Sequence, residues 1–364
     1  MSDDRDSHLA NLGRRHAGKP QPPQPAVTRT TRFHGQFAHA RWQSIAWAPD
    51  GSQLAFGGRT GKGAGVLEIW NGQSGHHEGH SARQLTDGVA GPVTALAWAP
   101  DCARLATVEQ NQWSGQPEVR VRGKAEGVRA LAPLPNLVVS QVTWSPDGSL
   151  IALSGQGAGT VLVDAASGMV RRVLDGLSGP VAWEPRVRLI AGVDGTGVVL
   201  CDPATGERVR TLTGRQQHVP AAMAWARHGK YLAVADGEDI RVWDAEAGES
   251  QWKLPWATSE GDRGPDGSVT SLEWLDGGHY LLEFRPRGGT ERDERGTTSS
   301  SVILWDTETG KTVFNWRFYE TTPQGRMPIA AIAATPDGRR MTHAIDGCAP
   351  VIWQINCDLP HYLP

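Results

Sequence analysis

The chain has 364 residues, with 36 lysines and arginines against 39 aspartates and glutamates, a formal net charge of −3. This near-neutral balance argues against a dedicated nucleic-acid binder, which usually carries a strongly basic face. The four cysteines are too widely spaced to suggest a disulfide framework, and no apolar run is long enough to cross a bilayer or to act as a secretory leader. We therefore expect a cytoplasmic protein without nucleic-acid or membrane partners.

Two further features of the composition stand out. Tryptophan occurs 15 times against 6 phenylalanines and 4 tyrosines, and 44 glycines with 24 prolines predict many tight turns. Residues 1–25 are polar and contain a PQPPQP tract, which predicts a disordered tail. We expect residues 26–364 to form a single domain.

The tryptophans belong to an internal repeat. Segments such as SIAWAPDGSQLAF from Ser44 and SQVTWSPDGSLIAL from Ser140 recur seven times along the chain. The repeats are spaced 39 to 60 residues apart, scattered above the period of about 40–45 residues that is typical of propeller blades. The equivalent position is occupied by Trp47, Trp98, Trp144, Trp183, Trp225, Trp274 and Ala334.

Each repeat predicts four strands. An apolar run such as VTALAW suits an innermost strand buried on both faces, and a Pro-Asp-Gly turn leads into the second strand. The third strand ends in an aromatic or apolar residue before an acid or amide, as in DIRVWD from Asp239, and a glycine-containing turn precedes the fourth. No stretch shows a persuasive helical period.

Trp243-Asp244, Trp305-Asp306, the Pro-Asp-Gly turns and the seven repeats resemble the WD40 family of β-propellers over roughly residues 27–357. The W-[AS]-P-D-G strand openings are also similar to TolB-like propeller repeats. The Gly-His dipeptide that usually precedes the first strand of a WD40 repeat is missing from its expected place in most repeats. The resemblance implies a propeller fold and, since WD40-like proteins commonly act as scaffolds, a role in binding other proteins.

The ends of the chain predict how the ring closes. The seventh repeat supplies three strands before the chain ends, whereas AVTRTTRFHG from Ala26 alternates as a strand and has no other partner. Pairing these segments would remove an unpaired edge. The predicted fold is therefore all-β: a seven-bladed β-propeller of four-stranded antiparallel blades, closed by an N-terminal strand.

Loop lengths predict which side of the ring binds a partner. Turns between strands one and two and between three and four emerge on one side and are short. Loops between strands two and three, and crossings between blades, emerge on the other side and include nearly all the long segments. Long loops in compact domains are often functional, so we place the binding surface there, weighted toward blades five to seven.

Six residues are the candidates for partner binding. Trp113 and Trp256 border long loops where no repeat requires an indole, with loop packing as the alternative reading. The arginines could bind an acidic partner, although the acids interleaved with them favour a solvated mixed-charge loop. The candidates are Trp113, Trp256, Arg59, Arg285, Arg287 and His218.

Motifs for chemistry are weak. His76, His77 and His80 lie in a Gly/Ser-rich turn without the ordered spacing of a metal site, and the sequence contains no nucleophile elbow, phosphate-binding lysine loop or Cys-x-x-Cys pair. We expect no cofactor, no metal and no catalysis, and the sequence leaves the oligomeric state open. The predicted function is a protein or peptide interaction scaffold. The alternative is a binder of small molecules or glycans, possibly an enzyme, using the central channel with loop tryptophans.

Overall fold

The computed structural model describes most of the predicted domain. The segments 1–25, 33–39, 75–87, 213–219, 255–270, 286–299 and 357–364 are the longer ones outside the description, so the predicted disordered tail lies outside it. The residues described are 26–32, 40–74, 88–131, 137–157, 159–212, 220–236, 239–254, 271–275, 278–285, 300–318, 320–322, 325–327, 329–335, 337–345 and 351–356.

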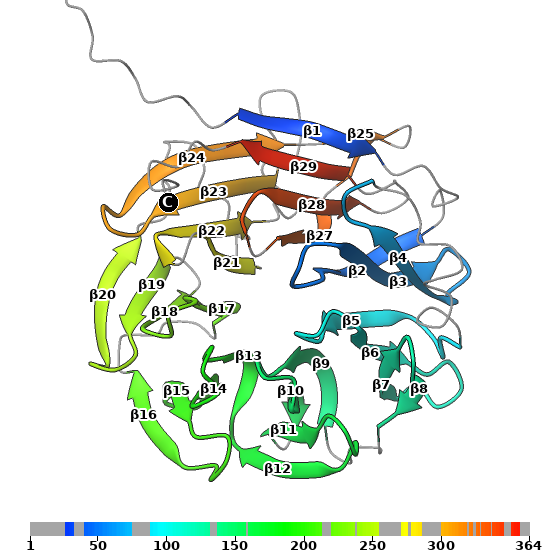
Figure 1. Cartoon of the computed structure of the whole chain (residues 1–364), viewed down its shortest axis with the longest axis horizontal. Coiled ribbons are helices and arrows are strands. Elements are labelled where there is room, and N and C mark those ends of the chain that lie inside the picture. The colour runs from blue at the N-terminus through cyan, green and yellow to red at the C-terminus, as the bar shows by residue number, and fades with distance from the viewer. Residues whose placement is uncertain are drawn as a thin grey trace, which may run out of the picture.

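Antiparallel sheets follow one another around a ring, as the sequence predicted (Figure 1). Blade 1 shows three strands among the described residues, and blades 2 to 6 show four each. From the innermost strand outward, blades 1 to 3 contain β2 (Ala40–Trp47), β3 (Gln53–Thr60), β4 (Gly65–Asn71); β5 (Val93–Trp98), β6 (Arg104–Gln110), β7 (Pro117–Gly123), β8 (Gly127–Ala130); and β9 (Leu137–Trp144), β10 (Leu150–Gly157), β11 (Gly159–Asp164), β12 (Val170–Asp175). Blades 4 to 6 contain β13 (Ser178–Trp183), β14 (Ile190–Asp194), β15 (Gly197–Cys201), β16 (Arg208–Leu212); β17 (Ala222–Trp225), β18 (Tyr231–Asp236), β19 (Asp239–Asp244), β20 (Glu249–Leu254); and β21 (Ser271–Leu275), β22 (Tyr280–Arg285), β23 (Ser300–Asp306), β24 (Lys311–Phe318).

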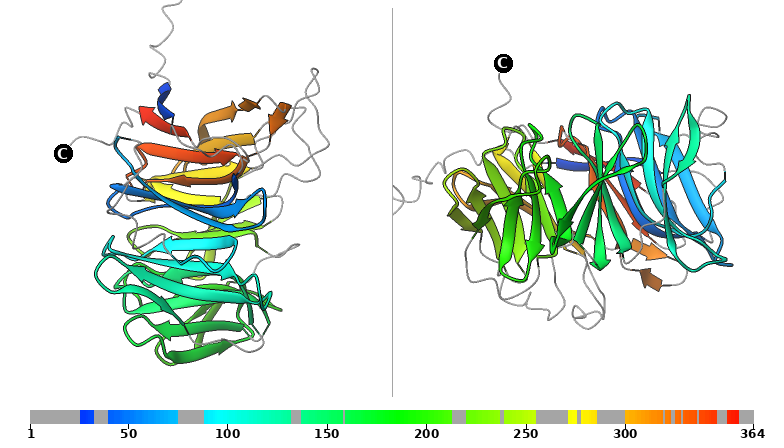
Figure 2. Two further views of the ribbon diagram at one scale, coloured as in Figure 1. Left: turned by 90° about the vertical axis from the view of Figure 1, so that its right-hand side faces the viewer. Right: turned by 90° about the horizontal axis from the view of Figure 1, so that it is seen from below.

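The seventh blade joins the two ends of the chain. It contains β27 (Ile329–Ala334), β28 (Arg340–Ile345) and β29 (Val351–Asn356), and β1 (Ala26–Arg32) pairs with β29 as its outermost strand. This confirms the predicted closure by an N-terminal strand. A separate hairpin of β25 (Glu320–Thr322) and β26 (Gly325–Met327) stands off the ring between blades 6 and 7 (Figure 2). Within the described segments there is no helix long and apolar enough to span a membrane.

The hydrophobic core is divided among the interfaces between blades. Seven clusters of buried apolar side chains are present, and each combines residues from two adjacent blades. For example, Val108 and Val121 of blade 2 pack with Leu153 and Val163 of blade 3. Each blade is therefore stabilised by its two neighbours, as in other repeat architectures.

The repeated tryptophans of the innermost strands tie these interfaces together. The indole Nε1 of Trp98 donates to Ala46 O at 3.2 Å, and that of Trp144 donates to Ala97 O at 3.0 Å. Trp225 and Trp274 repeat the contact at 3.0 and 2.8 Å with blades 4 and 5. Four of the six indoles thus bond to the preceding blade, which explains in part why the sequence repeats tryptophan here. Trp47 and Trp183 contribute apolar packing instead, since their Nε1 atoms are buried without a hydrogen-bond partner in the described part of the chain.

The innermost strands differ from one expectation. They are not buried on both faces: β5 alternates buried and partly exposed residues, whereas β3 and β22 of the second-strand position are almost continuously buried. The apolar run predicts a doubly covered strand, but Ala95 and Ala97 of β5 are only partly buried. The first turns follow the predicted chemistry, with positive φ at Gly51, Gly148 and Gly338, although Cys102 and Val187 adopt φ of 57° and 60° in blades 2 and 4.

Candidate interaction surface

Two of the expected long loops are short hairpin turns. β3 continues to Thr60 and β4 begins at Gly65, which leaves residues 61–64 as the turn in blade 1. β6 continues to Gln110 and β7 begins at Pro117, which leaves residues 111–116 in blade 2. The glycines and polar residues at these strand ends predict loops, but the residues belong to the strands. These turns, with the crossing at residues 88–92, lie on one side of the ring, which we call the crossing face; the first turns of the blades lie on the opposite, turn face.

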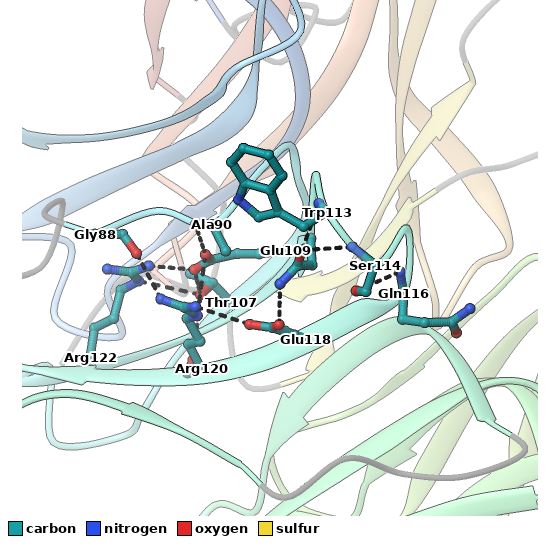
Figure 3. Close-up of polar contacts among 11 residues, drawn as sticks. Gly88, Ala90, Thr107, Glu109, Trp113, Ser114, Gln116, Glu118, Arg120 and Arg122 are labelled. Atoms are coloured by element: carbon teal, nitrogen blue, oxygen red, sulfur yellow. Dashed lines mark hydrogen bonds and ion pairs between the residues drawn. The ribbon is translucent and has the colours of Figure 1, made fainter.

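Trp113 stands at the tip of the blade 2 turn. Its indole is 95% exposed, so it does not pack as the loop-packing reading required. The backbone beneath it is well defined: Asn111 Oδ1 accepts hydrogen bonds from the N–H groups of Trp113 at 2.8 Å and Ser114 at 3.0 Å. Gly115 donates its N–H to Asn111 O at 2.8 Å with φ of 67°. The turn holds the indole outward from the sheet (Figure 3).

A buried polar cluster lies at the base of this hairpin. Glu109 and Arg122 are both fully buried and form an ion pair, and Thr107 Oγ1 donates to Glu109 Oε1 at 2.7 Å. The second oxygen of Glu109 accepts the N–H of Ala90 at 2.7 Å (Figure 3). Removing one member of such a pair would leave a buried charge without compensation. The cluster therefore fixes the crossing between blades 1 and 2 against the hairpin that carries Trp113.

Arg120 adds a second link between the hairpin and the crossing. Its Nη1 donates to Gly88 O at 2.7 Å, and its Nη2 donates to Glu118 Oε2 at 2.9 Å. Asn111 Nδ2 also donates to Glu118. The hydrogen bond from Arg120, together with the one from Asn111, lowers the pKa of the Glu118 carboxyl. Glu118 is thus held ionised as a fixed part of the hairpin.

The two candidate arginines in the described segments have different environments. Arg59 is exposed near the end of β3, on the crossing face. Arg285 is 6% exposed at the end of β22 and pairs with Glu283, whose second oxygen accepts from Trp305 Nε1 at 2.7 Å. Arg59 is available to a partner, whereas Arg285 belongs to a buried network.

The other candidates lie outside the described residues: Trp256, Arg287 and His218. Most of the long segments that weighted the prediction toward blades five to seven also lie outside the described residues. The same is true of His76, His77 and His80. The structure therefore brings Trp113 and Arg59 onto one face and buries Arg285, and it leaves the three candidates outside the described residues as predictions.

The sequence patterns do not single out Arg41, Glu109 or Arg122. Arg41 is exposed on β2 directly opposite Arg59, a pairing that depends on an irregularity in register between Trp42 and Ser44. Glu109 and Arg122 meet across β6 and β7. A charged residue within an otherwise apolar strand would have been the available signal for the buried pair. No signal in the sequence reveals the register of β2.

The ring of seven repeated sheets, with tryptophan hydrogen bonds between blades, defines a seven-bladed β-propeller, and part of its sequence is similar to WD40 repeats. The family model described as "WD domain, G-beta repeat" matches residues 206–244. This range covers the outermost strand of blade 4 and the first three strands of blade 5. The sequence repeat therefore begins one strand earlier than the blade does. For the same reason, β1 supplies the outermost strand of blade 7.

A search of known proteins gives a distant relative in Arabidopsis thaliana, described as "Cell division cycle 20.1, cofactor of APC complex". The two sequences are 24% identical over 180 residues, which is 48% of this chain. The match covers 39% of the relative's length. The description names the relative, not this chain, as a cofactor of a complex.

Proposed function

We propose that this chain is a non-catalytic interaction scaffold that binds a protein or peptide through its crossing face. The observation that carries the proposal is Trp113, an indole 95% exposed on a turn that its own hydrogen bonds hold in place. Exposing so large an apolar side chain to water is unfavourable, and tryptophan is enriched among residues that dominate binding energy at interfaces. The family and the distant relative support a protein partner. An indole this exposed does not enclose a small ligand, which favours a protein partner over the small-molecule alternative.

The location of the protein is part of the same proposal. Cys102 and Cys201 are free thiols, which suits a reducing compartment such as the cytoplasm. A fluorescent fusion of the full chain would test this placement. Fluorescence confined to another compartment would contradict it.

Replacing Trp113 by alanine should abolish partner capture and leave folding unchanged. The intact protein would be used as bait, and captured proteins would be quantified by mass spectrometry. Met169 supplies a matched control, because it is 67% exposed at a turn on the opposite, turn face. Met169→Ala should retain the partners that Trp113→Ala loses, and both variants should melt with the wild type. A partner set that survives Trp113→Ala would refute the assignment of this face.

A further inference from the structure

Two exposed arginines are paired across the first blade. Arg41 of β2 lies directly opposite Arg59 of β3, and both side chains are exposed. Directly opposed residues of an antiparallel pair have Cβ atoms about 5 Å apart, and like charges at this spacing are destabilising. No carboxylate in the described part of the chain forms an ion pair with either guanidinium. The pair is therefore a local concentration of positive charge with no ion-pair partner among the described residues.

Strand alternation directs these arginines toward the second blade. Gly57 lies two residues before Arg59 on β3, so both positions face the same side of the sheet. A Cβ on Gly57 would meet Val93 Cγ1 at 2.6 Å and Leu96 Cδ2 at 2.9 Å, and both belong to blade 2. The two arginines therefore point to the side of blade 1 on which blade 2 packs, at the crossing-face end of the strands.

Two glycines bring the backbone beside Arg59 into contact with the Trp113 hairpin. Gly65 is the cross-strand partner of Arg59, and a Cβ on Gly65 would lie 1.9 Å from Gly91 O. A Cβ on Gly91 would lie 1.8 Å from Gln110 O and 3.2 Å from Gln112 Cγ. Only glycine permits backbones this close. The path from Arg59 to the residue before Trp113 therefore crosses just one intervening segment, residues 88–92.

This intervening segment is held from the blade 2 side. Glu109 accepts the N–H of Ala90 at 2.7 Å, and Arg120 donates to Gly88 O at 2.7 Å. The segment is thus hydrogen-bonded to the hairpin that carries Trp113 (Figure 3), and its Gly91 lies against Gly65, the cross-strand partner of Arg59. A surface organised before binding loses less conformational entropy on association.

We propose that Arg41, Arg59, Lys62 and Trp113, which we call the arginine–tryptophan rim, bind an acidic peptide segment of a protein partner. The inference rests on the proposed scaffold function. A carboxylate placed between Arg41 and Arg59 accepts charge-assisted hydrogen bonds from both guanidiniums and removes their repulsion. An apolar side chain of the same segment packs on Trp113. Lys62, exposed in the adjacent turn, extends the positive surface.

A protein acid fits this rim better than a nucleic acid does. The chain as a whole carries a formal charge of −3, whereas sequence-independent binding of a phosphate backbone needs many cations along an extended path. Three cations beside one indole match a short segment that combines a few carboxylates with an apolar residue.

The test is a titration of the purified full chain with a fluorescent peptide of alternating Asp and Glu around one Leu, read by anisotropy. The matched peptide carries Asn and Gln in place of the acids, and a labelled single-stranded oligonucleotide serves as the third probe. The variants are Arg41→Gln with Arg59→Gln, and Trp113→Ala. The control, Arg186→Gln with Arg227→Gln, removes two exposed charges from the turn face.

We expect the acidic peptide to bind the wild type and the control equally, and each rim variant about tenfold or more weakly. The arginine variant should also show a flatter salt dependence, whereas Trp113→Ala should keep the wild-type salt slope. Loss of the opposed like charges should leave the melting temperature of the arginine variant equal to or above that of the wild type.

Three outcomes would overturn the rim as an acidic-peptide site. These are no binding of the acidic peptide up to about 1 mM, equal binding by the arginine variant, or preferential binding of the oligonucleotide with the same residue dependence. If Trp113→Ala still loses cellular partners while the arginine change has no effect, the scaffold proposal stands and the acidic-peptide proposal fails. If neither change affects partner capture, the scaffold proposal on this face fails as well.

Discussion

Replacing Glu273 by glutamine should stabilise the fold at pH 8 and flatten the pH dependence of its stability. Glu273 lies on β21 immediately before Trp274, at a position where blades 1, 2, 4 and 5 have alanine. Blade 7 has Ala334 where the other blades have tryptophan, so no indole bonds back to blade 6. The carboxylate of Glu273 instead accepts the N–H of Ala334 at 3.3 Å. Burial raises the pKa of this carboxyl to about 7, against a smaller lowering by that hydrogen bond.

The sign and size of the effect follow from the pKa difference. The folded chain retains the proton up to about pH 7, whereas the unfolded chain loses it near the ordinary value of 4.5. Stability is therefore greatest below pH 4.5, decreases as the pH rises to 7, and stays lower above it. A full difference of this size would correspond to about 3 kcal/mol. Because Glu273 is partly exposed, solvent screening reduces this, and we expect about 1–2 kcal/mol at pH 8.

Urea unfolding of the full chain at a series of pH values from about 5 to 8.5 would measure this difference. Glu273→Gln keeps the shape and an acceptor for Ala334, so the two proteins should be similar at pH 5 and diverge as the pH rises. Glu126→Gln is the matched control, since Glu126 is exposed in a turn of blade 2. Parallel pH profiles for Glu273→Gln and the wild type, or a loss of stability at pH 8, would refute the reasoning.

Two further substitutions test the turns and the interfaces between blades. Val187 adopts φ of 60° where other repeats place glycine, and this backbone conformation costs a β-branched residue about 1–2 kcal/mol. Val187→Gly should therefore raise the free energy of unfolding, measured in urea, by about 1 kcal/mol. No increase would show that the turn is not strained. Trp144→Phe removes the 3.0 Å hydrogen bond to Ala97 O together with part of the packing. It should lower the free energy of unfolding by about 1–3 kcal/mol in the same assay. A smaller decrease would mean that the indole contributes only its volume.

The architecture could be predicted because its packing is repeated in the sequence. Trp98, Trp144 and Trp225 make the same contact with the preceding blade, so the same residue recurs at the same place in the repeat. Ring closure could be predicted from an inventory of strands, since the last repeat has three and Ala26–Arg32 alternates without another partner. The residues behind both predictions have roles that are determined by the nearby sequence or by the repeat.

The surface could be predicted only in part because its geometry depends on register. Trp113 stood out because no repeat accounts for it. Arg41 did not, because its position opposite Arg59 depends on an irregularity between Trp42 and Ser44. A shift of one residue in pairing moves every following side chain to the other face of a sheet. The sequence of β2 alone does not encode that shift.

The buried ion pair could not be predicted from the sequence either, because it also depends on how strands pair. Glu109 and Arg122 are 13 residues apart and become neighbours through the pairing of β6 with β7. Seen in sequence, Glu109 opens a polar stretch and predicts a loop. In the fold it is a fully buried acceptor that binds the crossing beside Trp113. The hairpin is therefore shorter and more fixed than a polar loop of that composition would be.

Departures from the repeat can act independently because the core is divided between blades. Glu273 and Ala334 alter the interface between blades 6 and 7, whereas Arg59 and Trp113 lie where blades 1 and 2 meet. Each interface has its own hydrophobic cluster, so a change at one is not transmitted through a shared core. The repeated tryptophans can therefore maintain the ring while residues outside the repeat change the stability of one interface and the binding properties of another. On this reasoning, the residues that break the repeat are the ones whose role is not explained by folding alone.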